Sequence, residues 1–91
     1  MWIFNKNNQL INIDKSLCIS MSKGKSYYDD NAVLQTYYYI CADGKKIAKC
    51  INEENAIIEL ENIKKCISEN KSIYQINGIK MIEDENGNPI D

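Results

Sequence analysis

The residue types that could do chemistry in this chain are cysteine, lysine, the acids and tyrosine, because histidine and arginine are absent. Without histidine, Ser-His-Asp and Cys-His arrangements cannot form, and the usual general base near neutral pH is missing. A reactive thiol needs a nearby cation or a helix N-terminus to lower its pKa. Only Cys50, beside Lys49 and two residues before Asn52, meets that requirement, and a packing role fits it better. We therefore expect no catalytic residue and no enzymatic activity.

The four cysteines occur singly along the chain, at Cys18, Cys41, Cys50 and Cys66. Zinc sites usually present their ligands in closely spaced pairs, which this spacing lacks. A disulfide framework belongs to an oxidising compartment. The chain shows no signal-peptide pattern and no apolar run near the roughly 20 residues that a membrane helix needs. We expect reduced, mostly buried cysteines, no metal, no cofactor, no membrane contact and a cytoplasmic location.

Seven of the thirteen acidic residues form contiguous groups, at 29–30, 53–54 and 83–85, and the formal net charge of the chain is −2. Contiguous carboxylates on a loop or at a helix start do not converge across a cleft as catalytic pairs do. All eleven cations are lysine, which supplies charge without the planar fork of arginine. We therefore expect these acidic side chains to be solvated, and we expect the chain not to bind nucleic acid directly.

The element with the clearest turn signal is a β-hairpin over residues 33–51, centred on Asp43-Gly44. A two-residue type I′ turn needs positive φ at both central positions, which Asp-Gly tolerates. Such a turn pairs Ile40 with Ile47, whereas a three-residue loop with a bulge shifts every partner by one. The sequence leaves both registers open, and one slip exchanges the two faces of the hairpin.

A helix is predicted over residues 53–69. Asn52 is a favourable N-cap, and Glu53 and Glu54 place negative charge where the helix dipole favours it. We expect Leu60 and Ile63 to pack against a sheet. The apolar stripe at helical spacing consists of Ala56, Ile57, Leu60, Ile63, Cys66 and Ile67.

The remaining residues predict a three-stranded antiparallel meander over 1–22, a polar loop over 23–32, and a strand with an acidic tail over 73–91. Trp2 and Phe4 project to the same side of the first strand, and we expect both to anchor the core. The predicted fold is one α+β domain over residues 1–91. It consists of an antiparallel sheet of five to seven strands with one amphipathic helix packed on it, and a pleckstrin-like half-barrel is one topology that fits.

Tyrosines and acids provide the candidate binding residues. Because one helix covers only one face of a sheet, tyrosines on the opposite face can stay near the surface, where tyrosine is a preferred contact residue. Burial of the strand tyrosines in the core remains an alternative, as does a small-molecule or nucleotide site on the tyrosine-lined face. A homodimer also remains open. The predicted protein-binding residues are Tyr27, Tyr28, Asp29, Asp30, Tyr37 and Tyr39.

Three segments together resemble a group of small proteins of Firmicutes phages and mobile elements, over residues 2–67. The segments are WIFNKNNQLINID, YYICADGKKIA and EENAIIELENI. The shared features are a meander, an A-D-G hairpin and a C-terminal helix, and no catalytic or binding residue is carried over with them. The resemblance implies a protein-interaction module in an anti-defence context, such as an anti-CRISPR inhibitor of a host nuclease complex.

Overall fold

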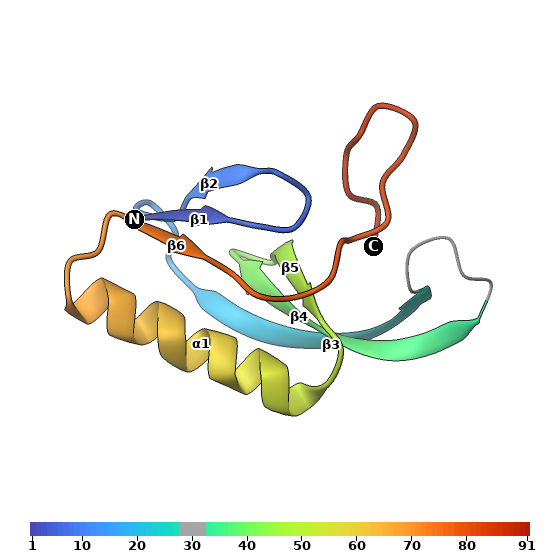
Figure 1. Cartoon of the computed structure of the whole chain (residues 1–91), viewed down its shortest axis with the longest axis horizontal. Coiled ribbons are helices and arrows are strands. Elements are labelled where there is room, and N and C mark those ends of the chain that lie inside the picture. Colours follow the sequence, from blue (N-terminus) through green and yellow to red (C-terminus); the bar gives the residue numbers. More distant parts are fainter. Residues whose placement is uncertain (28–32) are drawn as a thin grey trace.

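The computed structural model describes residues 1–27 and 33–91. In these residues it confirms the α+β class, with two three-stranded sheets and one helix (Figure 1). No helix among them is long and apolar enough to cross a bilayer. In chain order the elements are β1 (Trp2–Phe4), β2 (Leu10–Asn12), β3 (Ile19–Tyr27), β4 (Leu34–Ala42), β5 (Lys45–Cys50), α1 (Glu53–Ser68) and β6 (Ile73–Gln75).

The first sheet has the order β2-β1-β6, so the predicted meander over residues 1–22 is wrong in its third strand. β1 pairs antiparallel with β2 as expected, but its other neighbour is β6, which runs parallel to it. Residues from Ile19 onward belong to the second sheet. Alternation of apolar residues identifies a strand but not its partner. Here the second neighbour of β1 is β6, which follows α1 in the chain and is brought back beside β1 after the helix has crossed the molecule (Figure 1).

The second sheet has the order β3-β4-β5 and is antiparallel throughout. The predicted loop over 23–32 is wrong for residues 23–27, which extend β3 and end with Tyr27 opposite Leu34. Polar residues fit there because β3 is at the margin of the sheet, where lysine is common.

The β4–β5 turn has the predicted two residues, with positive φ at Asp43 (51°) and Gly44 (82°). A bulge then follows, so Ile40 lies opposite Ala48 instead of Ile47. The two-residue turn therefore holds for Ala42 and Cys41, the three-residue loop does not occur, and the partners are shifted by one residue only beyond the bulge. The Asp43 carboxylate also accepts 2.9 Å hydrogen bonds from the amides of residues 17 and 18, which ties the turn to the start of β3.

The main core lies between α1 and the two sheets. Asn52 caps the helix by accepting a 2.8 Å hydrogen bond from the amide of Asn55. Ile63 is buried as predicted, but Leu60 is only partly buried, and Ile57 is exposed. The buried core residues are Ile3, Ile13, Ile40, Ile47, Ala48, Cys50, Ala56, Ile63 and Ile76.

All four cysteines lie among the described residues and are free thiols. Cys41 and Cys50 are buried, Cys66 is partly buried and Cys18 is exposed. The prediction that the cysteines are mostly buried therefore fails at Cys18, which precedes β3 at the surface.

Candidate functional site

Of the six predicted binding residues, the structure describes Tyr27, Tyr37 and Tyr39, and these three do not form one exposed surface. Tyr37 and Tyr39 are buried, so their rings offer no contact area to a partner in this structure. Tyr27 is exposed at the end of β3. Tyr28, Asp29 and Asp30 lie outside the described residues. The binding role of the segment from Tyr27 to Asp30 therefore stays a prediction.

The strand tyrosines are buried because the chain after β6 returns over their side of the second sheet. The amide of Ile79 donates a 2.9 Å hydrogen bond to the carbonyl oxygen of Lys49, and the side chain of Ile79 packs against the cluster formed by Tyr37, Tyr39 and Cys41. Gly78 permits this close approach, since a Cβ there would lie 2.5 Å from the Lys49 carbonyl oxygen. A small-molecule or nucleotide site on this face would need space that the protein's own chain occupies.

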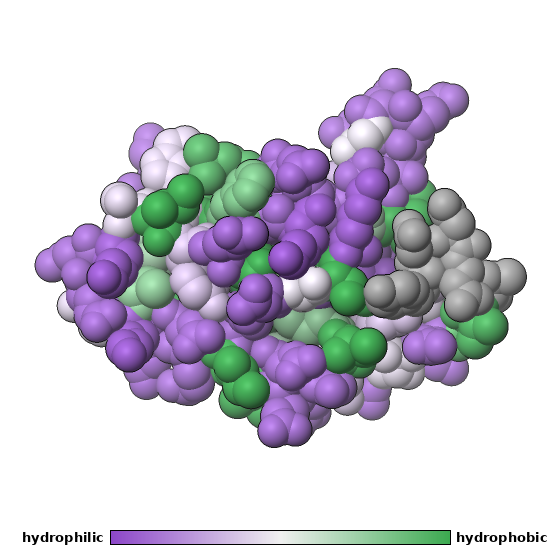
Figure 2. All heavy atoms as spheres, viewed as in Figure 1, coloured by the Kyte–Doolittle hydropathy of each residue, from purple (hydrophilic) through white to green (hydrophobic). Residues whose placement is uncertain are grey.

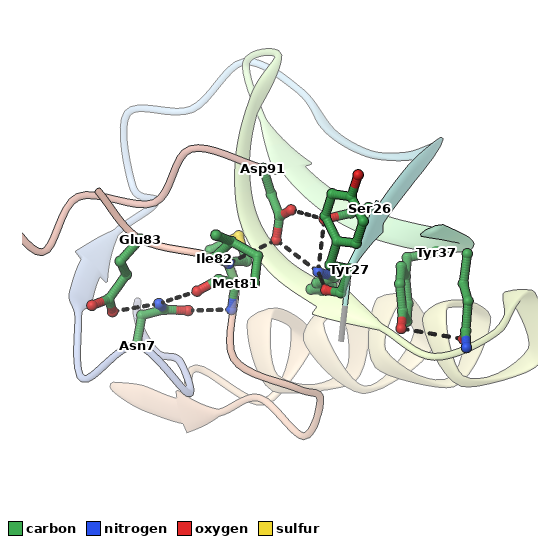
Figure 3. A network of polar contacts seen from close by, with 10 residues as sticks. Asn7, Ser26, Tyr27, Tyr37, Met81, Ile82, Glu83 and Asp91 are labelled. Carbon is green, nitrogen blue, oxygen red and sulfur yellow. Dashed lines mark hydrogen bonds and ion pairs between the residues drawn. The ribbon is translucent and has the colours of Figure 1, made fainter. Parts of the chain in front are cut away.

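A buried ion pair between Lys49 and Asp91 joins the end of this returning segment to the second sheet (Figure 3). The Lys49 ammonium donates hydrogen bonds of 3.0 Å to the Ser26 hydroxyl, 2.7 Å to the Tyr27 carbonyl oxygen and 2.9 Å to the Asp91 carboxylate. It also lies 4.5 Å from the centre of the Tyr37 ring. We call Ser26, Tyr37, Lys49 and Asp91 the Lys49 cluster.

The Lys49 cluster is arranged as a structural tie rather than as a reactive centre. The three ammonium hydrogens of Lys49 have three acceptors, and the Ser26 hydroxyl donates to Asp91. Burial alone would raise the pKa of Asp91, but hydrogen bonds from Ser26, Lys49 and the Ile82 amide, together with the lysine charge, hold it below its ordinary value.

Two asparagines of the turn between β1 and β2 make contacts that are distant in sequence: Asn7 contacts the returning segment, and Asn5 contacts β5. The Asn7 side chain accepts a 2.8 Å hydrogen bond from the Met81 amide and donates one of 2.9 Å to the Met81 carbonyl oxygen (Figure 3). It donates another, of 2.6 Å, to Glu83. The Asn5 side chain donates a 2.8 Å hydrogen bond to the Ile47 carbonyl oxygen. The sequence indicates a turn at these asparagines but carries no signal for partners 42 to 76 residues away.

The first sheet presents an uncharged outer face that the sequence did not predict. Ile3 is buried, so its neighbours in β1 point the opposite way, and Trp2 is 41% exposed. The prediction that Trp2 anchors the core is therefore wrong, and Phe4 is only partly buried. By strand register, the outer face consists of Trp2, Phe4, Leu10, Asn12, Ile73 and Gln75.

The apolar members of this outer face lie on all three strands of the sheet. Trp2 lies beside Ile73, which is 56% exposed, and Phe4 lies beside Leu10, which is 53% exposed. Hydrophobic side chains are visible over β1, β2 and β6 in the upper left of Figure 2. Exposed aromatic and aliphatic side chains gathered on one sheet face are typical of a docking surface.

A third feature is a buried carboxyl group on α1. Glu59 is 4% exposed, accepts a 2.5 Å hydrogen bond from the Tyr74 hydroxyl and accepts one of 3.3 Å from the Asn77 amide. Burial outweighs both hydrogen bonds and raises the pKa of Glu59. Burial and the charge of Glu59 together raise the pKa of Cys50 to about 11. The Cys50 thiol therefore ionises less readily than an ordinary cysteine, whereas a reactive thiol needs a lowered pKa.

Glu59→Gln is expected to change how stability depends on pH. The folded chain holds the Glu59 proton more tightly than the unfolded chain, so the wild type should lose stability as pH rises above the ordinary value of 4.5. Glutamine does not titrate and can keep both hydrogen bonds, because the Tyr74 hydroxyl can reorient. Urea unfolding from pH 4 to 8 should show a smaller decline for the variant. An identical pH profile would mean that Glu59 is not desolvated.

Comparison of the chain with protein-family models, curated proteins and solved structures finds no match in any of the three, so no relative supplies a role for the outer face, the Lys49 cluster or Glu59.

Proposed function

We propose that the chain is a non-enzymatic protein-interaction module that binds its partner through the outer face of the first sheet. The observation that supports this best is the exposure of Trp2 beside Ile73 on a sheet face without a charged side chain. Tryptophan is enriched among the residues that dominate binding energy, because its large apolar surface is buried while its ring NH can still be paired.

The chemistry of this face favours a protein over a nucleic acid or a phosphorylated ligand. Phosphate recognition relies on lysine, arginine or clustered backbone amides, and none of the six outer-face residues is charged. A specific protein interface buries about 800 Å² on each partner, which is more than a few side chains supply. The partner should therefore also contact the polar turn between β1 and β2, at residues 5–9.

The class of partner follows from the resemblance to small proteins of phages and mobile elements. We propose a host-defence protein, with a CRISPR-type nuclease complex as the first candidate and inhibition as the consequence of binding. The uncharged outer face would then dock on an apolar patch of that complex.

The test is a binding and cleavage assay with purified CRISPR-type nuclease complexes. The variant is Trp2→Ser with Ile73→Ser, and the control is Ile57→Ser, which changes an equally exposed residue of α1 outside the outer face. Wild type and control should bind and inhibit the same complex. The double variant, shown to be folded by circular dichroism, should bind at least tenfold more weakly, which corresponds to about 1.4 kcal/mol.

Two results would count against this proposal. If the folded double variant bound and inhibited as well as wild type, the outer face would not be the contact surface. If the wild-type chain bound none of the nuclease complexes, the anti-defence role would be wrong.

A further inference from the structure

Within residues 1–27 and 33–91, the buried carboxyl group of Glu59 belongs to none of the ion pairs. The ion pairs recorded for the described residues join the Met1 amino group with Asp14, Lys49 with Asp91, and Lys80 with Glu83, and none of them includes Glu59. An ionised carboxylate removed from water is costly unless a cation or several hydrogen bonds compensate it. Glu59 accepts two hydrogen bonds, and one of them is long at 3.3 Å.

Glu59 lines a cavity of about 370 Å³ between the start of α1 and the segment after β6. Of its lining residues, Cys50 and Glu59 are buried, whereas Ile51 and Ile58 are about half exposed. A cavity of this size is in the range of small-molecule sites. Its lining residues are Cys50, Ile51, Asn55, Ile58, Glu59, Asn77, Gly78 and Ile79.

The lining matches one kind of ligand group. The carboxylate oxygens of Glu59 keep lone pairs after accepting one hydrogen bond each. The isoleucines provide an apolar wall for methylene groups, and the side chains of Asn55 and Asn77 add amide oxygens. A primary ammonium on a methylene stem has three donors for these oxygens and an apolar body for the wall.

We propose that this cavity binds a primary alkylammonium group, with its methylene stem against Ile51, Ile58 and Ile79 and its ammonium paired with Glu59. An anion would be repelled by the carboxylate. A divalent cation needs more oxygen ligands than one carboxylate supplies. No group of three metal-ligating residues occurs among residues 1–27 and 33–91. The ammonium can belong to a free amine or to a lysine side chain of another protein.

The raised pKa of Glu59 agrees with this assignment, because a bound cation would favour the ionised form and lower that pKa again. The titratable groups that face Glu59 are the Tyr74 hydroxyl from β6 and the Cys50 thiol from β5. Both are ordinarily neutral near pH 7, and burial raises the pKa of Tyr74 further, to about 12, and that of Cys50 to about 11. The site therefore offers an ammonium a carboxyl group that is joined to no cation by the ion pairs of residues 1–27 and 33–91. The proposal does not rest on the outer face of the first sheet.

The test is an NMR titration of the full chain with n-butylammonium, 1-butanol and butyltrimethylammonium. The first should shift the amide signals of Cys50 and Asn77 and lower the pKa of Glu59, read from its carboxyl carbon. Butanol lacks the charge and butyltrimethylammonium lacks the N–H donors, so both should bind at least tenfold more weakly. Glu59→Gln should weaken butylammonium binding at least tenfold, and the matched control Glu61→Gln, at an exposed position of the same helix, should not.

A second arm identifies the source of the ammonium. Nα-acetyl-lysine methylamide and a lysine-containing peptide should bind more tightly than butylammonium if the natural ligand is a protein side chain, and more weakly if it is a free amine. Equal binding of butanol and butylammonium, unchanged binding by Glu59→Gln, or no binding of any ammonium would overturn the proposal.

Discussion

Lys49→Met is expected to lower the free energy of unfolding by about 3–5 kcal/mol, the usual cost of removing one partner of a buried ion pair. Methionine leaves the Asp91 carboxylate buried without a cation, and it also leaves the Tyr27 carbonyl oxygen without its 2.7 Å donor. The segment after β6 would lose the attachment at its end, while the backbone hydrogen bond between Ile79 and Lys49 would remain. Urea unfolding at pH 7 measures the change, which is a large part of the roughly 5–15 kcal/mol that stabilises a domain.

Lys46→Met is the matched control for this substitution. Lys46 also belongs to β5, and its ammonium lies 4.2 Å from the centre of the Tyr39 ring, but it is only partly buried and has no carboxylate partner among the recorded ion pairs of the described chain. Its loss should cost about 1 kcal/mol or less. If Lys49→Met cost no more than Lys46→Met, the ion pair would contribute nothing specific.

The double variant Lys49→Met with Asp91→Leu isolates the ionic part of the effect. It removes both charges together, so its loss of unfolding free energy should be smaller than the sum of the losses of the two single variants.

The wild type should also lose the stabilising contribution of the Lys49–Asp91 pair in acid. Because the pKa of Asp91 is below its ordinary value of 3.8 in the folded chain, that contribution is complete above pH 3.8 and disappears as the pH falls through the lowered pKa.

Ile63→Ala is expected to cost about 2–5 kcal/mol, the range for truncating a large aliphatic side chain in a packed core. Ile63 is 2% exposed and lies in the cluster that joins α1 to both sheets. The truncation leaves a cavity at the contact that holds the helix in place. Thermal and urea unfolding should show the loss, with a native-like far-ultraviolet spectrum below the transition.

Ile67→Ala tests whether burial or helix propensity causes that loss. Ile67 lies one turn after Ile63 on α1 and is 52% exposed. Its truncation should change the free energy of unfolding by about 0.5 kcal/mol or less, in line with other surface substitutions. Equal effects at the two positions would mean that α1 does not bury the face described here.

Local features of the fold could be predicted from the sequence because each depends on neighbouring residues. Asp43-Gly44 accepts the positive φ of a two-residue turn. Asn52 has the side-chain oxygen that the first free amides of a helix need, and α1 begins at the next residue. Together with the alternation in the strands, these features determined the α+β class.

The tertiary structure decided which strands pair and which faces are covered. β1 lies between β2 and β6, so Ile3 points into the core and Trp2 points outward, opposite to the expectation for Trp2. The returning chain, through Ile79 and Asp91, covers the tyrosine face that was predicted to bind a partner.

The physical reason is the distance along the chain over which each interaction acts. Turn and cap preferences act over two to four residues, so the amino-acid types alone specify them. The contacts of Lys49 with Asp91 and of Asn7 with Met81 span 42 and 74 residues. Lysine and asparagine at those positions could equally have been solvated, as is usual for these residues. Only the packing of the whole chain brings each one to its partner. The same packing buries Tyr37 and Tyr39 and exposes the uncharged outer face of the first sheet.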